Sequence, residues 1–193
     1  MLLYGKFFFG DSFFFVILIA EFLLFTYKKK VFLALYQSGF PGFIGGLILG
    51  LGFSAYVFAM YNTTVANANF IIQTQAIFLA IFGYLFLKEK ISKLTLASII
   101  LAMSGILLMV GNSLSPGQLF GNLVAFIMPI SFAVLIIIVR KYPNVDMVPL
   151  QLFAGIVAML IGYFVSSKIS VSTHDLILGF LAGFFKLDLA LFL

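Results

Sequence analysis

The chain has 193 residues, of which 64% are hydrophobic and 9% are charged. A soluble domain has about 25% charged residues and avoids large exposed apolar patches, so this composition excludes a soluble globular fold and favours a protein embedded in a lipid bilayer. The eleven basic residues lie between apolar runs and form no single patch, which excludes nucleic acid as a partner. The absence of cysteine excludes disulfides, thiolate catalysis and zinc–cysteine sites.

Seven apolar segments follow one another along the chain, and each approaches the about 20 residues that a membrane-spanning helix needs. They are residues 7–27, 40–61, 65–87, 94–111, 119–139, 147–167 and 175–193. The runs are continuously apolar, and a helix satisfies its backbone hydrogen bonds internally, so helices are predicted and barrel strands are not. The first segment contains Asp11 and Glu21, and the last contains Lys186 and Asp188. The sequence predicts an all-α integral membrane protein with seven transmembrane helices.

The loops between these segments alternate in charge. Eight Lys or Arg residues lie in three loops, at 28–30, 88–93 and 140–141, whereas the other side has two, Lys6 and Lys168. Cytoplasmic loops carry an excess of Lys and Arg, so the three basic loops are predicted to be cytoplasmic. The chain then begins outside, and we expect a further helix before Met1.

Two pairs of glycines indicate an internal repeat. Gly46 and Gly50 match Gly179 and Gly183 at an offset of 133 residues, and five helices separate the matched segments. An odd number of helices reverses the direction across the membrane. The pattern therefore indicates an inverted-topology repeat, which is common in secondary transporters.

Polar residues gather where the third segment begins: eight Asn, Thr and Gln residues fall within positions 61–75. On a helix, one narrow stripe is formed by Asn62, Ala66, Asn69, Gln73, Ala76 and Ala80. Asn67 and Thr74 form a second, adjacent polar line. An amide that faces lipid lacks a hydrogen-bond partner at a cost of a few kcal/mol, so both lines should face protein or water. Two interpretations stay open: hydrogen bonds between helices, or the wall of a hydrated path for a polar solute.

The second segment carries further candidates. Gly42, Gly46 and Gly50 are spaced four residues apart, which predicts a groove for close helix packing. Beyond the groove, Tyr61 is interpreted as an interfacial residue, while the deeper Tyr56 is predicted to face a cavity.

Three other polar positions are candidates for the path. Glu21 lies within an apolar run, and ionisable groups in such runs typically serve function, so Glu21 is a candidate ionisable transport residue. Gln151, like Asn122 and Ser131, is predicted either to line the path or to pack between helices. Pro129 removes one backbone donor and predicts a kink in the fifth segment.

Glu89 stands at the predicted cytoplasmic end of the third segment, between Lys88 and Lys90. It is interpreted as a structural charge that these neighbours neutralise.

Residues 57–111, VFAMYNTTVANANFIIQTQAIFLAIFGYLFLKEKISKLTLASIILAMSGILLMVG, resemble the third-to-fifth-helix core of an EamA-type member of the drug/metabolite transporter superfamily. The matching motifs are Thr64–Ala68, Leu87-Lys88-Glu89-Lys90-Ile91-Ser92 and Ser104-Gly105-Ile106-Leu107-Leu108. Residues 121–142, GNLVAFIMPISFAVLIIIVRKY, are similar to the first helix of the family's second repeat. The resemblance covers about residues 12–185.

The resemblance implies a ten-helix bundle built from two inverted five-helix repeats. Residues 1–115 would be the first repeat without its first helix, and residues 116–193 the truncated second repeat. The resemblance also implies the bacterial cytoplasmic (inner) membrane and is compatible with a homodimer. The chain departs from the family in lacking a proline near Ala76, and in having Lys186 and Asp188 where Gln and Gly are frequent.

The function predicted is secondary-active transport, as exporter or importer, of small polar metabolites such as amino-acid-like solutes. The substrate-pathway residues predicted are Tyr56, Asn69, Gln73, Thr74 and Gln151. No cofactor or metal is expected, no phosphate-binding loop is present, and no catalytic motif of an intramembrane enzyme is found, so an enzyme is not predicted. The alternative is a seven-helix receptor or retinal-binding protein with Lys186 as the Schiff-base lysine, although the chain has no tryptophan to wall a retinal pocket.

Overall fold

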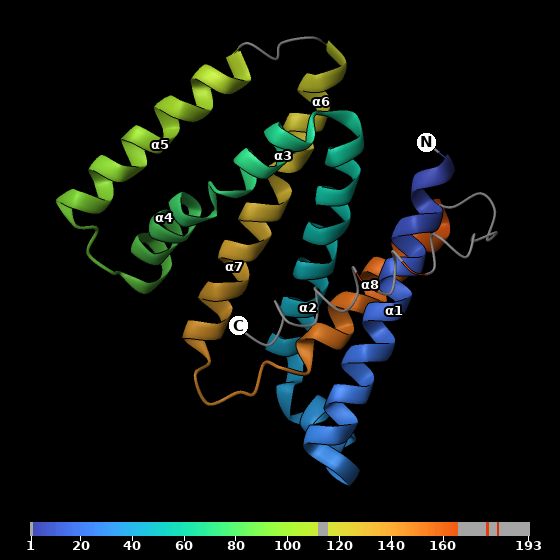
Figure 1. Ribbon diagram of the computed structural model, residues 1–193. Helices are drawn as coiled ribbons and strands as arrows, with labels where there is room; N and C mark the ends of the chain where they lie inside the picture. Colours follow the sequence, from blue (N-terminus) through green and yellow to red (C-terminus); the bar gives the residue numbers. More distant parts are fainter. Residues whose placement is uncertain (1, 112–115, 166–176, 178–180, 182–193) are drawn as a thin grey trace. The chain divides into compact units, whose positions relative to one another are not determined.

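The computed structural model describes residues 2–111 and 116–165, together with residues 177 and 181. The regular structure of these residues is helical throughout, as Figure 1 shows. The helices are α1 (Leu2–Tyr27), the short 3-10 helix η1 (Lys28–Lys30), α2 (Val31–Asn62), α3 (Val65–Ile72), α4 (Gln75–Leu87), α5 (Lys93–Gly111), α6 (Pro116–Ala125), α7 (Ile127–Lys141) and α8 (Leu150–Val165). The all-helical prediction is confirmed for the described residues, while the segment predicted at 175–193 lies outside them apart from residues 177 and 181.

Three stretches of the described chain are long and apolar enough to cross a membrane: residues 12–62, 65–87 and 118–141. The first has 51 residues, more than twice the about 20 that one crossing needs, and it contains most of α1 together with all of α2. The apolar parts of α5 and α8 are shorter. These lengths suit helices embedded in a bilayer.

The chain divides into two compact units, which we describe separately. The first unit holds residues 1–50 and 142–193, and the second holds residues 51–141. The boundary falls within α2, so the first part of this helix belongs to one unit and its last part to the other.

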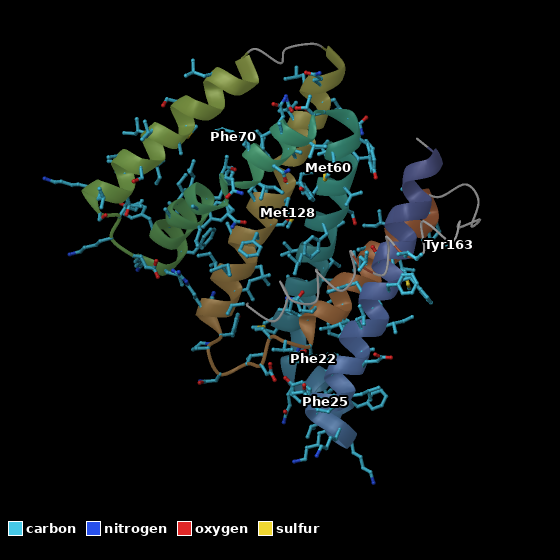
Figure 2. The ribbon with its side chains drawn as sticks, in the orientation of Figure 1. Phe22, Phe25, Met60, Phe70, Met128 and Tyr163 are labelled. Carbon is cyan, nitrogen blue, oxygen red and sulfur yellow. The ribbon has the colours of Figure 1, made fainter. Side chains whose placement is uncertain are left out.

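In the first unit, α8 packs along α1 (Figure 1). Phe15, Ile19 and Leu23 of α1 form a buried hydrophobic cluster; they are spaced four apart and so share one helix face. A side chain at Gly155 of α8 would come within 2.9 Å of the Phe15 ring, so glycine lets the two helices approach closely. Phe25 in the last turns of α1 is 85% exposed, which marks the opposite face (Figure 2).

The first part of α2 carries a kink and a groove. Gly39 has a φ of +55°, a conformation that other residues rarely adopt, and it bends the helix just before the apolar segment predicted at 40–61. Further along, a Cβ at Gly46 or Gly50 would lie 2.7 Å from a backbone oxygen of α8. The predicted packing groove is therefore confirmed for these two glycines, whereas Gly42 faces Ser38 in the kink of its own helix.

In the second unit, α4 packs on α7, and α3 contacts α5, α6 and α7. Ala59, Ile71 and Ala125 form a buried cluster contributed by α2, α3 and α6. Phe70 of α3 reaches toward α5, where a Cβ at Gly105 would lie 3.6 Å from its ring (Figure 2).

The stretch 118–141 is divided at Phe126 into α6 and α7. Pro129 lacks an N–H, so the carbonyl of Ala125 loses its helical partner there. The distortion predicted from Pro129 is thus present, and it falls on the turn that precedes the proline.

Within each unit, one contact joins two of the loops that are predicted to be cytoplasmic. In the second unit, Arg140 forms an ion pair with Glu89, so loops 88–93 and 140–141 meet at one end. In the first unit, the Tyr27 hydroxyl at the end of α1 donates to Asp146 in the α7–α8 loop. Each contact places two of these loops at the same end of its unit, and the side of the membrane that they face stays a prediction from charge.

Candidate functional site

Two of the predicted pathway residues meet in the second unit. The Tyr56 hydroxyl, in the last part of α2, donates to Asn69 Oδ1 on α3 at 2.6 Å. Neither residue is buried in the structure: Asn69 is exposed and Tyr56 is partly exposed. A phenol and an amide thus form a polar pair on a surface that the described residues leave uncovered.

The exposed polar face continues along the chain from this pair. Ala66, Asn69, Gln73 and Ala76 are all exposed, as their spacing on one helix face predicts. We call these four residues the amide stripe. Asn62, which was expected at its outer end, belongs instead to the end of α2, where its Nδ2 donates to the Phe58 carbonyl at 2.7 Å. The turn at Thr63 and Thr64 separates it from the stripe, because the helix predicted as continuous restarts at Val65.

The stripe crosses a break between α3 and α4, at Gln73 and Thr74. The Gln73 N–H bonds the Phe70 carbonyl at 3.2 Å, and the Ile77 N–H bonds the Thr74 carbonyl at 2.9 Å. In a regular α-helix these two N–H groups would bond the carbonyls of Asn69 and Gln73. The break therefore directs the backbone donors away from the carbonyls of the two amide residues of the stripe.

The cause of the break is a side chain, since no proline lies here. The Thr74 hydroxyl donates to the Ile71 carbonyl at 2.6 Å and its side chain is only 3% exposed. Thr hydroxyls that bond a carbonyl of the preceding turn compete with the helix ladder and bend it. Because the chain lacks the family proline, no kink was expected near Ala76, and the structure shows that a buried threonine produces one close by.

The amide stripe extends into the apolar span and carries no charge. At 1.5 Å per residue, Gln73 lies about 12 Å along the span from Val65. No charged residue occurs between residues 31 and 87. The polar groups at this depth are therefore amides, hydroxyls and backbone carbonyls.

The second polar line has the opposite environment. Asn67 is 7% exposed and its Nδ2 donates to Thr63 Oγ1 at 3.4 Å. Thr63 Oγ1 in turn donates at 2.5 Å to Oδ1 of Asn122 on α6, which is 1% exposed. Asn67, Thr63 and Asn122, with the buried Thr74, make up what we call the buried polar line.

The close approach of α6 to the α2–α3 turn explains this burial. A Cβ at Gly121 would collide with the backbone of Asn62 and Thr63. Asn122 Nδ2 has no hydrogen-bond partner among the described residues although it is fully buried. The buried polar line therefore ties helices together, in the manner of the interhelical interpretation.

Two residues predicted to serve in transport belong to the first unit, whereas the amide stripe belongs to the second. Gln151 is 4% exposed at the start of α8, and Glu21 is exposed on α1. Ser131, in the second unit, is buried where Gly52 of α2 approaches α7, since a Cβ at Gly52 would lie 2.8 Å from the Ser131 Cβ. Ser131 thus occupies a packing position.

Sequence reasoning missed three tertiary contacts: Tyr27 with Asp146, Thr63 with Asn122, and Glu89 with Arg140. Each joins residues more than fifty positions apart, so no local pattern reports it. The signal that was available for Glu89 was its isolation, because it is the one carboxylate in the sequence from 51 to 141.

Comparison with known protein families decides the wider assignment. A profile of the EamA-like transporter family matches residues 2–111, which is more than half of the 193-residue chain. The chain belongs to the EamA-like transporter family. Searches among curated proteins and among solved structures gave no match.

Membership in the EamA-like transporter family, together with the apolar helices, makes this chain an integral membrane protein of the drug/metabolite transporter superfamily. It indicates a membrane transporter, and it gives no support to the receptor or retinal-binding alternative. The resemblance read from residues 57–111 is confirmed.

Proposed function

We propose that this EamA-like protein is a secondary-active carrier of small polar metabolites, and that the amide stripe forms part of the solute path. The observation that carries the proposal is the Tyr56–Asn69 hydrogen bond on an exposed face, one helical turn before Gln73 at a break in the span. An exposed amide at this depth contacts lipid at a cost of a few kcal/mol, or it contacts water and solute. The second arrangement avoids that cost.

The break supports the same function. Secondary transporters bind solutes where spanning helices are discontinuous, because carbonyls released from the helix ladder become available there. The carbonyls released from their regular partners belong to Asn69 and Gln73, the residues whose side chains form the stripe. Side-chain and backbone groups of the same two residues therefore offer donors and acceptors together.

The chemistry of the stripe defines the class of solute. Phenol and amide groups donate and accept hydrogen bonds but carry no charge. A solute with several hydrogen-bonding groups and no net charge, such as a zwitterionic amino acid, suits such a wall. A multiply charged anion would lack a counter-charge between residues 31 and 87.

We further propose the complete architecture that the resemblance implies. Seven spanning helices would belong to a ten-helix bundle, with residues 1–115 in the first inverted repeat and residues 116–193 in the second. The family match to residues 2–111 supports the first of these regions. The cytoplasmic membrane of a bacterium and a homodimeric assembly are part of the same proposal.

The test is solute counterflow by the full-length protein reconstituted in liposomes. The probes are radiolabelled alanine, glutamine, phenylalanine and uridine, with phosphate and citrate as charged comparisons. We expect saturable counterflow of at least one uncharged or zwitterionic probe and none of phosphate or citrate. Tyr56→Leu should reduce that flux, whereas Tyr36→Leu, at an exposed tyrosine in the first part of α2 and in the other unit, should leave it unchanged. Counterflow restricted to the anions, or equal flux in both variants, would refute the proposed path.

A further inference from the structure

The ion pair between Glu89 and Arg140 joins two helices of the second unit at their cytoplasmic ends. Arg140 Nη1 lies 3.0 Å from both carboxylate oxygens of Glu89. Glu89 follows the end of α4, and Arg140 lies in the last turn of α7. Both side chains are about half exposed, at 52% for Glu89 and 44% for Arg140.

The end of α4 is shaped to present this carboxylate. Lys88 adopts a left-handed conformation with a φ of +56°, and the N–H groups of Lys88 and Glu89 both bond the Gly83 carbonyl. A left-handed lysine is unfavourable, because its Cβ crowds the backbone. A Cβ at Gly83 would lie 2.9 Å from Glu89 Oε2, so glycine also leaves room for the carboxylate. The sequence suggested neutralisation by Lys88 and Lys90, but the structure directs Glu89 to Arg140.

The surrounding charges make Glu89 the only acidic side chain that residues 51–141 offer at this end of the second unit. Between residues 51 and 141 the sequence has one carboxylate, Glu89, and five basic residues: Lys88, Lys90, Lys93, Arg140 and Lys141. Like charges on neighbouring helix ends repel one another. Without Glu89, the end of α4 and the end of α7 would both be positive.

We propose that the Glu89–Arg140 pair is a latch that holds the cytoplasmic ends of α4 and α7 together and breaks when the solute path opens to the cytoplasm. This inference rests on the proposed carrier function, since a carrier must open alternately to the two sides. The two residues also lie in the two regions proposed as separate repeats, whose relative movement alternates access. An exposed ion pair shifts an equilibrium by at most about fivefold, which is weak enough to break in every cycle.

The latch is tested by labelling from the cytoplasmic side. The parent sequence has no cysteine, so Ala76→Cys places a single thiol on the amide stripe between Gln73 and the cytoplasmic end. Inside-out vesicles that contain the full-length protein are treated with a membrane-impermeant maleimide. We expect Glu89→Gln and Arg140→Gln each to raise the labelling rate about two- to fivefold, because the open state becomes more populated.

Two matched variants separate the latch from general charge effects. Lys90→Gln removes a charge from the same loop and should leave the labelling rate unchanged. The double exchange of Glu89→Arg with Arg140→Glu restores the pair in reverse and should return the rate toward that of the parent. Equal labelling in the parent, the single variants and the double exchange would overturn the latch.

A second measurement distinguishes the failure of the latch from the failure of the carrier function. Glu89→Cys with Arg140→Cys is bridged by a short bis-thiosulfonate reagent, and solute counterflow is measured before and after reduction of the bridge. We expect bridging to stop counterflow and reduction to restore it. Normal counterflow after bridging would overturn the latch and leave the carrier function intact. Absence of counterflow in the unbridged parent would refute the carrier function, and the labelling rates would still report on the latch.

Discussion

The amide stripe and the buried polar line both draw polar residues from the stretch formed by α3 and α4, yet their environments are opposite. Asn69 and Gln73 are exposed, while Asn67 and Thr74, at neighbouring positions, are at most 7% exposed. The difference arises from what packs opposite each face: α6 covers Asn67, and in the described residues nothing covers Gln73 to the same extent. The burial of a polar residue in a membrane helix thus depends on the helix face that carries it. Residue type and depth along the helix do not decide burial by themselves.

The strongest test of this comparison is the double variant Asn69→Leu with Gln73→Leu. If the stripe lines a hydrated path, these leucines exclude water and deprive a solute of partners. The barrier should rise by a few kcal/mol, which is roughly a hundredfold loss of transport rate. We expect this loss in liposome counterflow, with a nearly normal melting temperature in detergent.

Ser98→Leu is the matched control for the double variant, because Ser98 is an exposed polar residue whose hydroxyl already bonds the Leu94 carbonyl of its own helix. It should retain transport. Normal transport in the double variant would reduce the stripe to a packing feature like the buried polar line.

The packing side of the comparison is tested at Gly121. Gly121→Ala would place a methyl group against the backbone of Asn62 and Thr63, which cannot turn aside as a flexible side chain does. We expect a loss of about 1–3 kcal/mol in the free energy of unfolding, read as a lower melting temperature. At Gly105 the same change meets only the Phe70 ring at an ordinary 3.6 Å, so Gly105→Ala should be neutral or stabilising. Equal melting temperatures for the two variants would contradict the close approach of α6.

A smaller effect is expected from Thr63→Val, which keeps the shape of the side chain and removes its hydroxyl. Asn122 Oδ1 then loses its donor inside the protein, at a cost of about 1 kcal/mol. The melting temperature should fall while transport per folded molecule stays normal. Thr26→Val, at an exposed threonine of α1, provides the comparison and should change neither quantity. A transport defect without a stability defect in Thr63→Val would move this residue from the buried polar line to the path.

The smallest effect is expected from Thr74→Val, and it sharpens the division most. The sequence placed Thr74 in the substrate path, but its burial and its bond to the Ile71 carbonyl place it with the buried polar line. Losing that bond should change stability by about 0.6 kcal/mol. Because the Thr74 side chain is buried and can influence the path only through the shape of the break, transport should fall less than it does in Gln73→Ala. Transport is measured by counterflow alongside Gln73→Ala. If Thr74→Val reduced counterflow as much as Gln73→Ala, burial would not distinguish the buried polar line from the amide stripe.

Much of the helical pattern was predictable from the continuous apolar runs and the lack of charge between residues 31 and 87. Such runs favour a bilayer, and in a bilayer a helix satisfies its own backbone hydrogen bonds. The distortion before Pro129 also followed from the known backbone preference of proline. The break at Gln73 was different. It depends on whether the Thr74 hydroxyl finds water, another helix or its own backbone, and tertiary packing decides among these.

The site was predictable in part for the same reason. Helical spacing correctly grouped Asn69 with Gln73 on one face, since that follows from geometry within eight residues. The partner of Asn69 was not predictable, because the Tyr56 side chain reaches it across a turn whose shape the spacing does not encode. The separation of the two polar lines likewise depended on α6, which lies about fifty residues further along the chain.

The Thr63–Asn122 hydrogen bond has a consequence for biosynthesis. The two residues are 59 positions apart, and a ribosome adding about 5–20 residues per second needs roughly 3–12 seconds to make the second after the first. When Asn122 is made, Thr63 lies 59 residues ahead of it on the chain, so the polar groups at the α2–α3 turn leave the ribosome before their partner on α6 does. The turn must be hydrated at the membrane surface, or held by the insertion machinery, until α6 arrives. The nascent helix pair therefore enters the membrane with its polar turn still in contact with water, and the last step of its assembly is the exclusion of that water.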